Sequence, residues 1–168
     1  MGELAAFLKE QSERLRASEP DRTAKLMEWK ESVRRLMAQL EEWVREADPQ
    51  QLIAIDESLS QRLAESKLGV YYTSRLSLQL GAQQIWVIPK ARNVLAVLNV
   101  AGREVRADGL VIITDYPPLG DQIPAAVYNL FRVLEPDGER WYLRYTTSKE
   151  VELLSRERFE HVLVTMLQ

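Results

Sequence analysis

Residues 26–47 read LMEWKESVRRLMAQLEEWVREA, and this stretch carries the strongest periodic pattern in the 168-residue chain. Its large apolar residues alternate between intervals of three and four, which places them along one side of an α-helix. These residues are Leu26, Trp29, Val33, Leu36, Leu40, Trp43 and Ala47. The pattern predicts a long amphipathic helix, and the apolar side of this helix needs something to pack against.

Two cap-like sequences divide the first 67 residues into three predicted helices. Ser18-Glu19-Pro20-Asp21 is typical of a helix start, because Ser can cap and Pro fits the first turn. Asp48-Pro49-Gln50-Gln51 repeats this logic, and Gly69 is suited to end a helix in the left-handed conformation. We therefore expect helices over residues 3–17, 20–47 and 48–67, joined as antiparallel neighbours in a helical hairpin. The third would carry on one face Leu52, Ile55, Leu59 and Leu63.

After Gly69 the apolar period changes to two, which is typical of strands with one solvated face. Short strands separated by Gly, Pro and Asp predict an antiparallel meander. The expected strands cover residues 76–80, 85–88, 94–100, 103–107, 110–114, 127–135 and 140–147. Ser155 is a candidate cap for a closing C-terminal helix, so the predicted class is α+β with a mainly antiparallel sheet.

Composition supports an ordinary globular protein. The chain is 46% hydrophobic, enough to bury a core, and it has no cysteine, which excludes disulfides, thiolate metal sites and a cysteine nucleophile. We find no signal peptide and no apolar run long enough for a membrane span, so a cytoplasmic location without membrane contact is expected. We expect a helical part (1–69) and a β-rich part (70–168) to form one cooperative unit.

Three features together resemble an uncharacterised family of bacterial proteins with a helical N-terminal part and a small β-rich C-terminal part. They are Glu28-Trp29-Lys30, the sequence Trp86-Val87-Ile88-Pro89 followed by Arg92-Asn93, and the ending from Leu153 to Leu167. The resemblance implies one continuous unit. It implies no activity, cofactor or site residue.

The first functional hypothesis is a non-enzymatic protein-interaction or structural module. The apolar stripe of residues 26–43 would join a protein partner or a second copy of the chain, with Trp29 and Trp43 supplying large contact areas. The candidate interface residues are Leu26, Trp29, Val33, Leu36, Leu40 and Trp43. The alternative is that the same stripe packs inside one chain, because an amphipathic helix needs a core in any case.

The second hypothesis is a module that binds an anionic ligand or nucleic acid. Residues 70–107 hold five basic residues and one acidic residue, Glu104. The candidate anion-binding residues are Arg75, Lys90, Arg92, Arg103 and Arg106. The net charge of −3 and the pI near 5.4 count against nucleic acid.

A third reading is an enzyme with an unrecognised site. No phosphate-binding loop, dinucleotide fingerprint, nucleophile elbow or zinc-protease motif is present, and no cofactor is expected. The single histidine, His161, has no visible catalytic partners. The long segment 115–126 contains Asp115 and Asp121, which could bind a cation or simply form turns.

Overall fold

The computed structural model describes residues 2–168 as an α+β fold with one long N-terminal helix, strands, and a short closing helix. The long helix is α1 (Glu3–Ala47) and the closing helix is α2 (Arg156–Leu167). The strands in chain order are β1 (Ala54–Asp56), β2 (Ser60–Glu65), β3 (Gly69–Ser74), β4 (Leu76–Leu80), β5 (Gln83–Ala91), β6 (Val97–Val100), β7 (Arg103–Arg106), β8 (Leu110–Thr114), β9 (Tyr128–Glu135), β10 (Gly138–Tyr145) and β11 (Glu152–Leu153).

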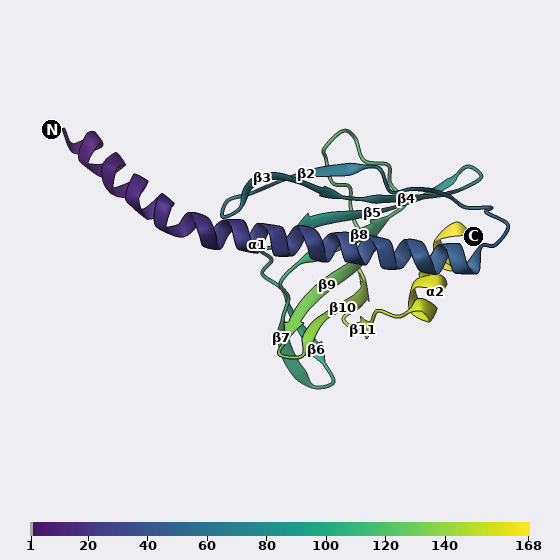
Figure 1. Ribbon diagram of the computed structural model, residues 1–168. Coiled ribbons are helices and arrows are strands. Elements are labelled where there is room, and N and C mark those ends of the chain that lie inside the picture. The colour runs from purple at the N-terminus through teal and green to yellow at the C-terminus, as the bar shows by residue number, and fades with distance from the viewer. Residues whose placement is uncertain (1) are drawn as a thin grey trace.

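Seven strands form one antiparallel sheet in the order β1-β4-β5-β8-β9-β10-β11. The remaining strands form two hairpins, β2-β3 and β6-β7, which leave the sheet between β1 and β4 and between β5 and β8. Figure 1 shows α1 running across the sheet while its first turns extend well beyond it. The predicted antiparallel sheet and C-terminal helix are therefore confirmed.

The two faces of the sheet are covered differently. Helices α1 and α2 pack on one face and share its core with buried strand residues such as Val87, Ile113 and Leu130. The β6-β7 hairpin covers part of the other face, where Leu98 and Phe131 belong to a second, smaller core cluster. Neighbouring β9 residues thus enter different cores, because side chains of a strand alternate between its faces.

The third predicted helix, over residues 48–67, is wrong, because β1 and β2 occupy this segment. Gln51 has a φ of 55°, a left-handed conformation that stops helix propagation. Asp48 accepts the N–H groups of Leu52 and Ile53 at 2.9 and 2.8 Å, so its carboxylate closes a turn instead of capping a helix. Gly69 does have a positive φ of 78°, but it serves the β2-β3 turn.

The predicted break near residue 18 is also absent, because α1 is continuous through Pro20. Ser18 donates its hydroxyl back to the carbonyl of Leu15 at 3.2 Å, so it sits within the helix and does not cap one. Proline has no N–H to donate to the preceding turn and its ring crowds that turn, which bends a helix without ending it. The change of direction is visible near this part of α1 in Figure 1.

Candidate functional sites

The predicted interface stripe lies mainly inside the protein. Trp29, Val33, Leu36 and Leu40 are buried in the core beneath α1, and Leu26 and Trp43 pack against it partly buried. The ring centre of Trp29 lies 6.2 Å from that of Trp141. The stripe therefore attaches α1 to its own sheet, which corresponds to the alternative reading of the pattern.

The first turns of α1 have a different environment. We define the arm as residues 3–21, the segment that extends beyond the sheet in Figure 1. Its large apolar residues Leu4, Phe7, Leu8 and Leu15 are 54–68% exposed. Because an α-helix turns by about 100° per residue, these side chains lie on the same side of α1 as the buried stripe. The arm therefore carries an apolar face that no other part of the described chain covers.

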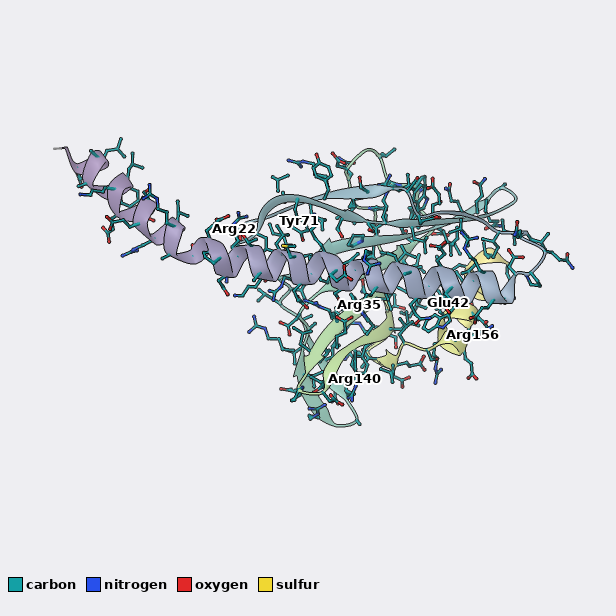
Figure 2. All side chains as sticks on the ribbon, viewed as in Figure 1. Arg22, Arg35, Glu42, Tyr71, Arg140 and Arg156 are labelled. Atoms are coloured by element: carbon teal, nitrogen blue, oxygen red, sulfur yellow. The ribbon has the colours of Figure 1, made fainter. Side chains whose placement is uncertain are left out.

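Arg22 marks the point where α1 meets the body. Its Nη1 donates to the carbonyl of Leu68 at 2.9 Å, which connects α1 to the turn between β2 and β3. Figure 2 shows Arg22 on α1 at the end of the body from which the first turns of the helix extend. The arm therefore begins where the last contact with the β-structure ends.

The five predicted anion-binding residues do not form one group. Arg75 donates to Gln61 Oε1 at 3.0 Å and lies 5.4 Å from the ring centre of Trp86, so it supports local packing. Arg103 pairs with Glu135 at 2.9 Å. Neither of these two arginines lines the cleft that the other three share.

Lys90, Arg92 and Arg106 line a cleft of about 450 Å³ that we call the basic cleft. A fourth basic residue, Lys67, joins them from the β2-β3 turn. Sequence reasoning missed Lys67, because the third predicted helix assigned it to a helix end far from the sheet. The cleft thus collects basic side chains from three segments that are distant in sequence.

A hydrogen-bond network that runs outward from the core anchors one wall of the basic cleft. Trp29 Nε1 donates to the hydroxyl of Tyr71 at 3.1 Å, and that hydroxyl donates to the carboxylate of Glu65. The same carboxylate accepts the backbone N–H groups of Arg92 and Asn93 at 3.1 and 2.9 Å. These direct hydrogen bonds connect α1 to the segment that carries Arg92.

Burial raises the pKa of the Tyr71 hydroxyl well above its usual range, and its hydrogen bond to Glu65 acts in the same direction. The group is therefore protonated at neutral pH. A protonated hydroxyl can accept from Trp29 and donate to Glu65 at once, which is the arrangement seen. The Tyr71 hydroxyl thus has a structural role, because it links Trp29 to Glu65.

Other chemistry considered from the sequence gains no support within residues 2–168. No group of three or more His, Asp or Glu side chains there could hold a metal ion. His161 is exposed on α2, and Asp115 and Asp121 are exposed in the connection between β8 and β9. In the same described range, no helix is long and apolar enough to cross a membrane.

Comparisons with protein-family models, with curated proteins and with solved structures found no match for this chain.

Proposed function

We propose that this protein is a non-enzymatic interaction module that binds a second copy of itself through the arm of α1. The observation that carries the proposal is the contrast along one helical stripe. Leu36 and Leu40 are 4% and 0% exposed where the stripe meets the sheet, whereas Leu4 and Leu15 are 68% and 66% exposed on the arm. A regular apolar face of this kind is typical of helices that pack against another helix.

A second copy is the occupant that best fits the size of the arm. Four large side chains on one arm offer too little apolar surface for a specific complex with a flat partner. Two arms bring eight, which would bury on the order of 1,000 Å² in total, the lower bound for a specific interface. The chain itself supplies a matching helix.

The charges of the arm also favour a protein partner. The arm contains five acidic and three basic residues interspersed around the apolar stripe. This slightly acidic surface would repel nucleic acid and anionic lipid, whereas mixed charges are compatible with a second helix of the same sequence. Gln11 lies between Leu8 and Leu15 on the stripe, and a polar residue at such a position can specify register.

The position of the body favours antiparallel pairing. The sheet covers the side of α1 that carries Trp29, and the arm stripe continues on that same side. In a parallel pair, the partner's helix would run on into the region that the sheet occupies. In an antiparallel pair, the arms overlap and the two bodies lie at opposite ends.

The test is sedimentation velocity over a wide concentration range, using the full chain and two double variants. Leu8→Glu with Leu15→Glu places two charges on the stripe and should give a folded monomer, because unpaired charge opposes burial. Ala6→Glu with Ala17→Glu adds the same charge to the opposite side of the arm and should leave the dimer intact. All four residues are exposed, so circular dichroism should show an unchanged body.

Any of three results would overturn the proposal. One is a wild-type chain that stays monomeric at high micromolar concentration. The second is a dimer that survives the stripe variant, and the third is a dimer that is lost equally with the variant on the opposite side.

A further inference from the structure

The basic cleft shares no lining residue with the arm, so its function can be considered separately. It lies where the β2-β3 turn meets the end of β5, the following segment and the end of β7. Lys67, Lys90, Arg92 and Arg106 contribute its basic side chains. Two acidic residues, Glu65 and Asp108, also line it, so the basic side chains outnumber the acidic ones.

We propose that the basic cleft binds a small ligand that carries two or more phosphate groups. Lys67, Lys90 and Arg106 are exposed and take part in no ion pair within residues 2–168. Cations that repel one another at close range favour a multiply charged anion between them.

Of the four basic residues, Arg92 is the best preorganised to bind an anion, because its backbone N–H is held by Glu65. Its guanidinium makes one side-chain hydrogen bond in the described part of the chain, from Nη1 to Asn93 Oδ1 at 3.1 Å. Its Nε is buried without a partner. A guanidinium can present several N–H donors to phosphate oxygens, and here most of them are uncommitted.

The acidic residues of the cleft do not neutralise this group. Glu65 uses its carboxylate on Tyr71 and on the backbone N–H groups of Arg92 and Asn93. The Glu65 carboxylate therefore holds the backbone of the segment that carries Arg92. Its negative charge is directed to these three donors. Of the two carboxylates that line the cleft, only that of Asp108 makes no side-chain hydrogen bond within residues 2–168, and it faces four basic side chains.

The lining of the cleft favours a small phosphate compound over a nucleic acid. No aromatic side chain lines the cleft, so unpaired bases would find no stacking surface there. Arg75 and Arg103, which might extend a track for a phosphate backbone, are engaged with Trp86 and Glu135 instead. The overall negative charge also weakens contact with a long polyanion.

The experiment is isothermal titration of the full chain with inorganic pyrophosphate and, separately, with inorganic phosphate and single-stranded RNA. We expect pyrophosphate to bind in the micromolar to millimolar range and more tightly than phosphate, because two groups contact more cations. Lys90→Glu with Arg106→Glu should weaken pyrophosphate binding by at least about tenfold, since each lost charge-assisted contact weakens the complex.

The matched control is Lys30→Glu with Lys149→Glu, which changes the net charge equally at exposed positions away from the cleft. It should leave pyrophosphate affinity nearly unchanged. Absence of pyrophosphate binding at low salt overturns the proposal, as does equal weakening by both double variants. RNA that binds more tightly than pyrophosphate and depends on Lys90 and Arg106 would replace the small ligand by a nucleic acid. Sedimentation of the same samples reports the arm separately.

Discussion

The ion pair between Glu28 on α1 and Arg132 on β9 allows a sharp test of how α1 is held on the sheet. Arg132 is fully buried, and its Nη1 lies 2.5 Å from Glu28 Oε1. Its Nε and Nη2 donate to the carbonyl of Asp108 at 3.0 and 2.8 Å. The guanidinium also stacks 4.8 Å from the ring centre of Trp29. One buried cation therefore connects α1 with β9 and with the segment before β8.

The perturbation is Glu28→Ala, which removes the carboxylate and leaves the cation buried. Breaking a buried ion pair by removing one partner costs about 3–5 kcal/mol of unfolding free energy. Glu139 remains 3.8 Å from Arg132 Nη1 and supplies part of the lost compensation. Glu28 is itself 44% exposed, so its removal returns little desolvation energy. We expect a loss of about 2–4 kcal/mol, below the full value for a buried pair.

The chain provides a matched control three residues further along α1. Glu31 pairs with Arg34 at the same distance, 2.5 Å, but both side chains are about half exposed. Because exposed pairs contribute little, Glu31→Ala should leave the unfolding free energy nearly unchanged. Urea unfolding followed by tryptophan fluorescence measures both variants. Equal losses for Glu28→Ala and Glu31→Ala would refute the argument, because burial of Arg132 is the feature that distinguishes the two pairs.

Three further predictions concern α1 and the residues that contact it. Gly109→Ala should destabilise the fold by about 1–3 kcal/mol in urea unfolding, because overpacking is unfavourable and the new Cβ would lie 2.4 Å from Trp29 Cζ3; an unchanged midpoint would contradict this contact. Burial raises the pKa of Tyr71 above its ordinary value of 10.0, so the stability that its protonated form supplies is complete below that pH and is lost as the pH rises beyond it. Tyr71→Phe should flatten this alkaline loss in unfolding measured at a series of pH values, and an equally steep loss would argue against the assignment. Leu40→Ala should cost about 2–5 kcal/mol in a thermal or urea melt as a buried truncation, whereas Leu15→Ala should leave the melt of the monomer unchanged, because Leu15 is exposed.

The sequence predicted several elements of the sheet correctly because their signals are local, whereas the segments expected as strands over 94–100 and 103–107 form the separate β6-β7 hairpin. Alternation around Leu76 and Leu78, the Pro136-Asp137-Gly138 turn and the Ser155 cap each depend on neighbouring residues. In the structure, β4 begins at Leu76, β9 and β10 pair across that turn, and Ser155 Oγ accepts the N–H of Arg158 at 3.2 Å. In each case the residues of the motif favour one local backbone conformation, and the structure adopts it.

The β2-β3 hairpin was missed because its determining contacts are not local. Leu52, Ile55, Leu59 and Leu63 have helical spacing, yet only Leu63 of these is fully buried. Its neighbour Glu65 is held by Tyr71 and by the backbone beyond Lys90, which the sequence of the segment alone cannot reveal. The missed hairpin also hid Lys67, and with it the fourth basic residue of the cleft.

Pro20 connects the fold of α1 to the proposed role of the arm. A proline inside a helix removes one hydrogen bond and costs about 3 kcal/mol or more, so the turns before it gain little from the packed part of α1. The arm also exposes Leu4, Phe7, Leu8 and Leu15, which opposes its stability as a lone helix in water. Both costs fall if a second arm covers the stripe, because burial of apolar surface stabilises the helical turns that carry it. Figure 1 shows that the first turns of α1 run at an angle to the part of the helix that crosses the sheet, and a proline inside a helix, here Pro20, is a known cause of such a bend. The proposed self-association through the arm would account for both features, the helix on the far side of Pro20 and its uncovered apolar face.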